Sequence, residues 1–234
     1  MAAKTADDFA RMRESMIAEI ALHTFYVSGR IGKASLSRRV MLAMDAVPRH
    51  AFVPVELQAY AYANTPLPIG FDKTISQPFI VALMTDLLDL QPDDTVLEIG
   101  TGLGYQAAVL SRLARRVYSI EVIEELAVQA RQRLARLGSA NIELRIGNGY
   151  RGWPEHAPYD KIIATAAPDL IPPPLIGQLK PGGRMVIPAG LPDAQQLVLV
   201  EKDANGRIAT TDVLPVRFSQ MTEPEADRQA RDAQ

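Results

Sequence analysis

Three glycines at alternate positions, Gly100, Gly102 and Gly104, are the residues whose spacing points most directly to chemistry. They follow an apolar run that contains one acidic residue, Glu98, and a segment with helical spacing begins directly after them. Where a strand runs into a glycine turn at a helix N-terminus, a nucleotide-like ligand can approach the main chain, because glycine has no Cβ. The pattern predicts such a site over residues 98–104, with Thr101 inside the turn.

The spacing also narrows the choice of ligand. A dinucleotide fingerprint, G-x-G-x-x-G, requires a third glycine at position 105, where this chain has Tyr105. Glu98 would be a poor neighbour for a pyrophosphate and a good one for a cation. S-adenosylmethionine (AdoMet) carries a positive sulfonium and an ammonium but no phosphate. We therefore expect AdoMet at this turn, with S-adenosyl-L-homocysteine as its product.

Two further polar positions follow the next two predicted strands. Glu121 comes about twenty residues after the glycine turn, which suits a carboxylate that grips ribose hydroxyls. Its alternative role is a solvated carboxylate at the next helix N-terminus, worth about 0.3–1 kcal/mol. Asn148, between Gly147 and Gly149, suits a hydrogen bond to an adenine edge, although asparagine and glycine are also common in ordinary turns.

Alternating strands and helices are expected to position these residues. Short segments rich in β-branched residues, separated by segments with helical spacing, predict a right-handed parallel sheet. The strands are expected at 95–99, 117–121, 142–146, 161–165, 184–188, 197–201 and 213–218, and the helices between them at 105–114 and 123–137. The predicted fold class is α/β: a Rossmann-like, doubly wound, mostly parallel seven-stranded sheet with helices on both faces, preceded by an N-terminal helical segment.

The first 72 residues do not show this alternation of strand and helix patterns. Residues 7–20 predict an amphipathic helix that packs on the core, and residues 35–47 predict a second helix, capped by Ser35 or Ser37 and ended by Pro48. Residues 48–72 contain four prolines and no clear period, which predicts a long covering loop. Asn205-Gly206 marks a possible hairpin between the last two strands.

Composition excludes several classes of protein. The chain has 234 residues, a net charge of −2 and no cysteine, so disulfides, zinc–thiolate sites and thiol nucleophiles are ruled out, and no metal site is expected. The charge balance gives no basic field for nucleic acid. The charged first 19 residues contain no apolar core of a signal peptide, and no apolar run approaches a membrane span. We expect a cytoplasmic protein with no membrane or nucleic-acid partner.

Several segments resemble known enzymes. Residues 94–104, 117–121, 147–153 and 179–190 resemble class I AdoMet-dependent methyltransferases. Residues 47–54, 67–70, 73–78, 152–154 and 157–160 resemble one branch of that superfamily, the protein-L-isoaspartate (D-aspartate) O-methyltransferases. The block Thr74-Ile75-Ser76-Gln77-Pro78, at this distance before the glycine turn, is specific to that branch. The resemblance extends over about residues 40 to 220.

The resemblance implies an activity and a set of site residues. The activity is methyl transfer from AdoMet to the α-carboxylate of L-isoaspartyl residues in damaged proteins and peptides, in a sheet whose last strands swap order relative to most methyltransferases. The implied catalytic residue is Ser76. The expected cofactor contacts are Thr74, Ile75, Ser76, Glu98, Gly100, Thr101, Gly102, Gly104, Glu121, Asn148, Gly149 and Thr222.

Two positions depart from the family pattern. Asn148 stands where the family usually has aspartate, from which we expect weakened or altered cofactor binding rather than its loss. Ser219-Gln220 stands where a Val-Pro pair is common, at the C-terminal lip of the substrate groove.

A carboxylate acceptor needs no base, since it is already an anion at neutral pH, and this fits a chain with only three scattered histidines. Ser76 is expected both to orient that carboxylate through a hydrogen bond and to cap a helix over residues 77–90. A covalent role for this serine is not expected. The loop 66–72 and the segment 52–54 are expected to wall the peptide groove, and Trp153 to pack in the core.

The expected organisation is one compact domain that acts as a monomer. It comprises residues 1–72 (N-terminal helices and substrate-covering loop), 73–222 (AdoMet-binding methyltransferase core) and 223–234 (a polar tail). Two alternatives remain: a related O-methyltransferase for a dedicated biosynthetic peptide, and a non-catalytic AdoMet-binding module, which Asn148 motivates. A nucleic-acid methyltransferase is disfavoured by the charge balance.

Overall fold

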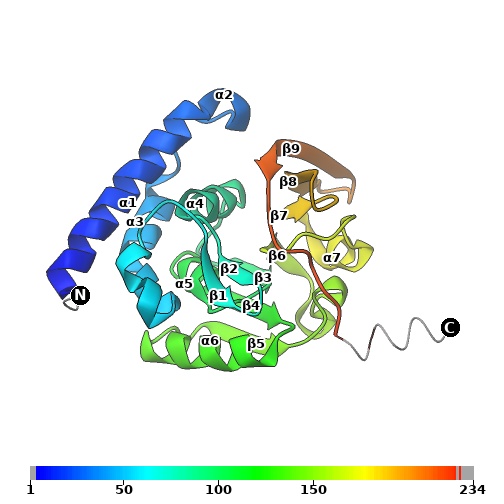
Figure 1. Ribbon diagram of the computed structural model, residues 1–234. Coiled ribbons are helices and arrows are strands. Elements are labelled where there is room, and N and C mark those ends of the chain that lie inside the picture. The colour runs from blue at the N-terminus through cyan, green and yellow to red at the C-terminus, as the bar shows by residue number, and fades with distance from the viewer. Residues whose placement is uncertain (1–3, 225–226, 228–234) are drawn as a thin grey trace.

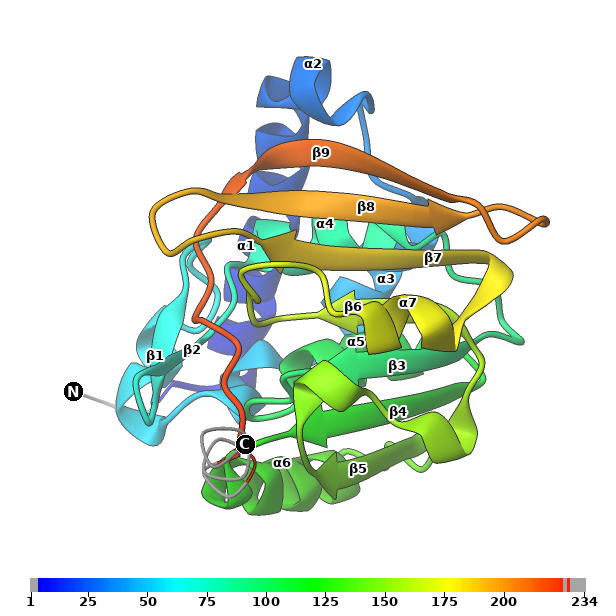
Figure 2. The ribbon, with the colours of Figure 1, turned by 90° about the vertical axis from the view of Figure 1, so that its right-hand side faces the viewer.

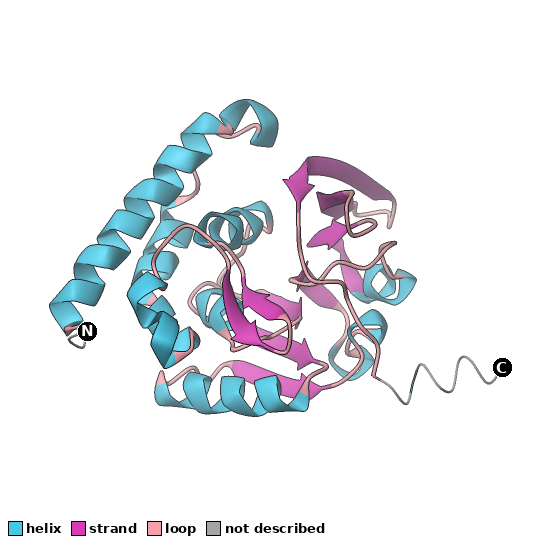
Figure 3. Ribbon diagram, viewed as in Figure 1, coloured by secondary structure: helices cyan, strands magenta, loops and turns pink. Residues whose placement is uncertain are grey.

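The computed structural model describes residues 4–224 and Asp227. A central sheet lies between two layers, and a long N-terminal helix runs along one side of the molecule (Figures 1 and 3). The expected tail, 223–234, falls outside the described residues except for Glu223, Pro224 and Asp227.

The sheet has the predicted class. Its order is β5-β4-β3-β6-β7-β8-β9. The strands are β3 (Thr95–Ile99), β4 (Arg116–Glu121), β5 (Ile142–Ile146), β6 (Tyr159–Ala164), β7 (Leu179–Ala189), β8 (Gln195–Lys202) and β9 (Ile208–Val216). The first five are parallel, β8 runs antiparallel to β7, and β9 runs antiparallel to β8. The last three strands lie side by side in chain order. The predicted hairpin joins β8 to β9 through residues 203–207.

Apolar side chains on the two faces of the sheet belong to two separate cores. On β3, the neighbours Val96 and Leu97 are both fully buried, one in each core. The larger core is covered by the helices α4 (Pro78–Leu87), α5 (Tyr105–Ser111) and α6 (Glu124–Arg136), and the smaller one by α7 (Pro173–Gln178). Trp153 is buried in the smaller core, as predicted. A strand that is buried on both faces has a nearly continuous apolar sequence, which explains why these strands could be predicted from the sequence.

The N-terminal helices pack on the larger core. They are α1 (Ala6–Tyr26), α2 (Ser28–Ile31) and α3 (Arg38–Ala46). Met16 and Ile20 of α1 are fully buried, as the amphipathic pattern predicted, although α1 extends beyond the predicted end. Ser37 caps α3 by accepting a hydrogen bond from the amide of Val40 at 3.3 Å. In the part of the chain that the structure describes, no helix is both long and apolar enough to cross a bilayer.

The prediction of a long loop over residues 48–72 was wrong. This stretch contains two 3₁₀ helices, Arg49–Phe52 and Val55–Tyr60, and the strand β1 (Leu67–Gly70), which pairs with β2 (Lys73–Ile75) in an antiparallel hairpin. The hairpin turns at Phe71 and Asp72, which both have φ of 54°. Turns with two positive φ angles normally contain asparagine or glycine, so this one carries no recognisable sequence signal.

Candidate active site

A hollow at the carboxyl ends of the central strands gathers most of the predicted site residues. Its wider part is lined by Thr74, Gly100, Gly102, Glu121, Gly149 and Thr222. An adjoining part is lined by Ile75, Ser76 and Thr101. The two parts share Thr74, Thr165 and the glycine turn, and together we call them the cofactor pocket. Figure 2 shows that the β1–β2 hairpin and the segment after β9 meet at this end of the sheet. Glu98, Gly104 and Asn148 do not line the pocket.

The glycine turn has no room for larger residues. Gly100 has φ of 93°, and a Cβ there would lie 2.6 Å from Oγ1 of Thr165. Gly104 has φ of 98° and packs against Leu134, so its role is to start α5 rather than to meet a ligand. Thr101 is buried and its hydroxyl lies 2.6 Å from that of Ser119, which leaves its main chain to face the pocket.

Glu121 is held at the end of β4 by main-chain donors. Its carboxylate accepts hydrogen bonds from the amides of Gly102 at 2.7 Å and of Val122 and Ile123 at 3.0 Å each. Burial raises the pKa of Glu121, while these amides oppose the shift. The carboxylate therefore bridges the glycine turn and the end of β4 on the pocket wall, which is compatible with the predicted grip on ribose hydroxyls.

Glu98 is completely buried behind the glycine turn. The hydroxyl of Ser119 donates to one of its oxygens, and the other oxygen has no hydrogen-bond partner among the described residues. Burial, with a contribution from the nearby carboxylate of Glu121, raises the pKa of Glu98 to about 8. A buried acid with one unpaired oxygen fits a positively charged ligand, because a cation nearby would stabilise its ionised form. Direct contact between Glu98 and AdoMet remains a prediction.

Asn148 faces the C-terminal segment instead of the pocket. Its Nδ2 donates to Oδ2 of Asp227 at 2.6 Å, and its Oδ1 accepts from the amide of Tyr150 at 2.9 Å. Arg151 lies 3.5 Å from the same Asp227 oxygen. The sequence offered no local signal for Asp227, which lies 79 positions further along the chain. A hydrogen bond from Asn148 to adenine remains a prediction.

Ser76 is not a helix cap, contrary to expectation. The cap of α4 is Gln77, whose side chain makes no capping bond, and Pro78 occupies the first turn. The proline has no N–H to satisfy, so the helix begins one residue later than the cap prediction required. The Ser76 hydroxyl makes no hydrogen bond with another described residue. It is therefore free to bind a substrate.

Sequence analysis overlooked Arg49, which fixes the position of Ser76. The guanidinium is fully buried, and it donates to the carbonyl oxygens of Ala61 at 2.8 Å and of Ser76 at 2.7 Å. It also lies 4.8 Å from the centre of the Tyr105 ring. Burial lowers the pKa of Arg49 to about 10. Apart from its place in the family-like block 47–54, its sequence signal is a basic residue inside a largely apolar segment.

A groove of about 620 Å³ opens onto the cofactor pocket. One wall comes from the end of α1 and from α2, the other from the end of β9 and residues 217–219, and Ser76 lies between them. Thr74, Thr165 and Ser219 line both the groove and the pocket. Of the expected wall segments, Pro66 lines the groove, whereas Phe52 and Val53 are buried core residues, so that part of the prediction was wrong. Among the described residues, no group of three or more His, Asp or Glu side chains is placed to hold a metal.

Comparison with known proteins agrees with this geometry. The family model for protein-L-isoaspartate(D-aspartate) O-methyltransferase matches residues 29–226. A protein-L-isoaspartate O-methyltransferase 1 from Polaromonas sp. is 69% identical over 221 residues, which cover 94% of each chain. A protein-L-isoaspartate O-methyltransferase 2 from Syntrophobacter fumaroxidans is 57% identical over 92% of this chain and 88% of its own.

Solved structures have the same fold. A protein-L-isoaspartate O-methyltransferase is similar with a TM-score of 0.78 and 29% identity, covering 94% of this chain and 69% of that one. A putative protein-L-isoaspartate O-methyltransferase from Plasmodium falciparum, in complex with S-adenosyl-L-homocysteine, gives a TM-score of 0.71 at 21% identity, over 87% of this chain and 97% of its own. The cofactor pocket, the adjoining groove and these matches together show that the chain belongs to the protein-L-isoaspartate(D-aspartate) O-methyltransferase family.

Proposed function

We propose that this protein transfers a methyl group from AdoMet to the α-carboxylate of L-isoaspartyl residues in damaged proteins and peptides. The observation that carries the proposal is the junction of two cavities. The groove is open enough for a peptide, and it meets the cofactor pocket at Thr74, Thr165 and Ser219, with Ser76 alongside. The methyl ester would then close to a succinimide, which reopens partly as normal aspartate, so the reaction serves repair.

The chain's own residues have a limited chemical task. Bound AdoMet supplies the methyl group and a positively charged leaving group, and the acceptor carboxylate is already an anion, so no general base is required. We expect the free hydroxyl of Ser76, which lines both cavities, to donate a hydrogen bond to the carboxylate and so to aim one oxygen at the methyl carbon. Holding the acceptor and AdoMet together in line can supply about 7–11 kcal/mol of the reaction barrier, of which this hydrogen bond is one part.

Exclusion of water is the second contribution of the protein. The β1–β2 hairpin and residues 219–222 cover the cofactor pocket, and Ile69, Ile99 and Met221 make part of its wall apolar. In such surroundings the attraction between a carboxylate and a sulfonium is much stronger than in water. A cation bound near the glycine turn would favour the ionised form of the buried Glu98, whose pKa burial raises to about 8.

The test is methylation of a matched pair of peptides. With labelled AdoMet, we expect the L-isoaspartyl peptide to become labelled and its aspartyl isomer to remain unlabelled. The ester should be base-labile and should release methanol as the succinimide forms. Equal labelling of the two isomers would contradict the proposal, and so would failure to label either one with protein that binds S-adenosyl-L-homocysteine.

We also propose that the protein acts as a monomer in the cytoplasm, where AdoMet is available. Light scattering at the concentration of the assay should give a mass close to 25.6 kDa. A larger mass that persists on dilution would contradict the monomer.

A further inference from the structure

The groove is lined by basic residues from two distant parts of the chain. Arg30 belongs to α2 and Arg217 follows β9, and these two elements lie next to each other at the edge of the sheet (Figure 2). His23, from α1, lines the same groove and stacks on Phe79 with ring centres 4.1 Å apart. The fold thus brings two guanidinium groups to opposite walls of one cavity.

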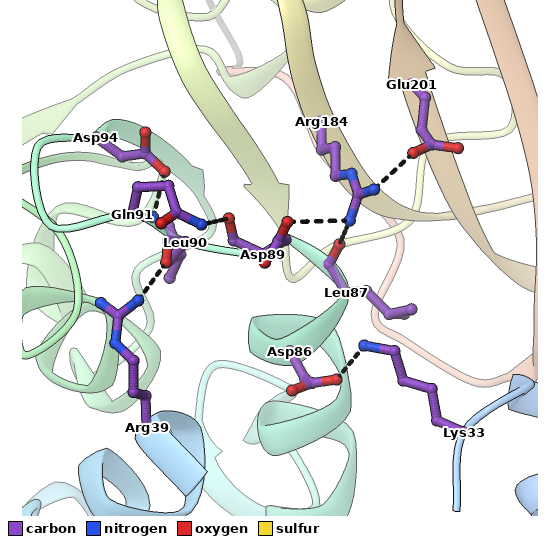
Figure 4. Close-up of polar contacts among 10 residues, drawn as sticks. All are labelled: Lys33, Arg39, Asp86, Leu87, Asp89, Leu90, Gln91, Asp94, Arg184 and Glu201. Carbon is purple, nitrogen blue, oxygen red and sulfur yellow. Dashed lines mark hydrogen bonds and ion pairs between the residues drawn. The ribbon is translucent and has the colours of Figure 1, made fainter. Parts of the chain in front are cut away.

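Among the described residues, neither arginine has a partner. Both are exposed, and neither side chain forms a hydrogen bond or an ion pair with another described residue. Some other cations of this protein are neutralised by carboxylates. Figure 4 shows Arg184 bound to Glu201 at 3.0 Å and Lys33 bound to Asp86 at 2.5 Å. Arg30 and Arg217 differ from these in that they line one cavity together with no carboxylate bound to either of them.

No acidic side chain offsets these cations within the groove. Of the aspartate and glutamate residues that the structure describes, none is among the residues that line this cavity. The groove therefore presents a positive surface on a protein whose net charge is negative. Guanidinium groups bind carboxylates through parallel N–H donors, which makes a carboxylate the matching ligand chemistry.

We propose that Arg30 and Arg217 form a subsite for a second carboxylate of the substrate, namely an aspartate or glutamate side chain close in sequence to the isoaspartyl residue. This inference rests on the proposed function, because it assigns a preference to the same groove. The carboxylate that becomes methylated lies at Ser76, where the groove meets the cofactor pocket, and the second one binds toward the open end between α2 and β9. Substrates rich in acidic residues are thereby favoured over basic ones.

The experiment compares isoaspartyl peptides that differ only in charge around the damaged residue. Each peptide carries acidic, amide or lysine residues at the flanking positions, on either side in separate peptides. For the unmodified protein, we expect the acidic peptide to have a KM roughly two- to five-fold below that of its amide counterpart, with little change in kcat. The lysine peptide should have the highest KM, and added salt should reduce the differences.

Charge reversal identifies the residues responsible. R30E and R217E should each abolish the preference for acidic peptides, and the double variant should favour the lysine peptide. R207E is the matched control, because Arg207 is an exposed arginine in the β8–β9 hairpin away from the groove and gives the same change in net charge. Thermal unfolding of all the variants checks that the fold is retained.

Two results would overturn the subsite. One is a wild-type protein that does not distinguish acidic from amide peptides, and the other is a preference that R30E and R217E alter no more than R207E does. Failure of the proposed function gives a different result, since the amide isoaspartyl peptide would then be methylated by no variant. In that case, calorimetric titration of the same peptides in the presence of S-adenosyl-L-homocysteine still tests the subsite.

Discussion

Ser76 has a free hydroxyl because a buried arginine holds its main chain. Arg49 binds the Ser76 carbonyl at 2.7 Å, and the capping of α4 falls to the next residue, Gln77. An anchored backbone with an unengaged side chain is what a residue needs in order to orient a substrate without moving. In this site, the residue that we expect to bind the substrate, Ser76, is therefore distinct from the residue that positions it, Arg49.

Ser76→Ala should lower kcat/KM for an isoaspartyl peptide by roughly ten- to a hundredfold, because it removes a hydrogen bond to a charged group. The affinity for S-adenosyl-L-homocysteine and the melting temperature should change little, since the hydroxyl has no partner in the protein. Steady-state kinetics and calorimetry measure the two effects. Ser76→Thr, which keeps the hydroxyl, should recover part of the activity. An unchanged kcat/KM in the alanine variant would remove Ser76 from the mechanism.

Glu98 should make the ligand-free protein pH-dependent. Its pKa is about 8 when folded, against 4.5 as the reference value, so the folded state binds more protons between these values. Its contribution to stability is therefore complete below pH 4.5 and is lost as the pH rises toward and through 8. Urea unfolding between pH 5 and 8 should show a steeper loss of stability for wild type than for Glu98→Gln. Parallel profiles for the two proteins would contradict the assignment.

Asn148 and Asp227 should be energetically coupled. Asn148→Asp replaces a donor with a second carboxylate facing Asp227, whereas adding Asp227→Asn restores a donor–acceptor pair. The double-mutant cycle on thermal stability should give a coupling of about 0.5–3 kcal/mol. The same four proteins, titrated with S-adenosyl-L-homocysteine, report whether this contact also affects the cofactor pocket. Strictly additive effects on stability would mean that the two side chains do not interact in solution.

The β1–β2 hairpin is the element that joins the two cavities. Residues of this hairpin line both the pocket and the groove, and its turn contains two non-glycine residues with positive φ. Such residues adopt this conformation only at an energetic cost, since a side chain in the left-handed region crowds the backbone. The hairpin is thus held by pairing and packing and not by its turn.

Asp72→Gly should stabilise the protein by about 0.5–1 kcal/mol, because glycine adopts φ of 54° without strain. The same substitution at Asp203 should have the opposite sign. That side chain accepts hydrogen bonds from the amides of Asn205 and Arg207 at 2.8 Å each, and their loss costs about 1 kcal/mol. Urea denaturation compares the two variants. A loss of stability in Asp72→Gly would show that the turn is not strained.

The elements that sequence could predict are those with local signals. The bounds of β3 and β5 match the prediction, because β-branched runs mark them, and the Ser37 cap of α3 was one of the two expected. The β1–β2 hairpin was missed because its turn contains Phe71 and Asp72 in place of the asparagine or glycine that normally marks such a turn. The Asn148–Asp227 and Arg49–Ser76 contacts were missed because they join residues 79 and 27 positions apart, and such pairings depend on the whole fold.

At the scale of the whole molecule, the N-terminal helices complete both the core and the groove. Helix α1 contributes Met16 and Ile20 to the larger core, and its C-terminal end contributes His23 to the groove. Although we distinguish residues 1–72 from 73–222, this sharing of one core leads us to propose that the two parts fold as a single unit. The cofactor pocket takes no residue from α1 or α2.

Ile20→Ala should lower the free energy of unfolding by about 2–5 kcal/mol, because it leaves a cavity in the core. Leu22→Ala, on the exposed face of the same helix, is the control and should have little effect. Unfolding followed by circular dichroism and by binding of S-adenosyl-L-homocysteine should give coincident transitions. Separate transitions would show that α1 melts independently of the methyltransferase core.

The size of the groove determines which proteins can be repaired. A cavity of about 620 Å³ between α2 and β9 has the size of a short stretch of extended chain and not of a folded domain. An isoaspartyl residue in a rigid helix or strand therefore cannot enter the groove until that region unfolds locally. Methylation then reports on the mobility of the client as well as on its chemistry, and a stable client would keep its lesions while a loosely folded one is restored.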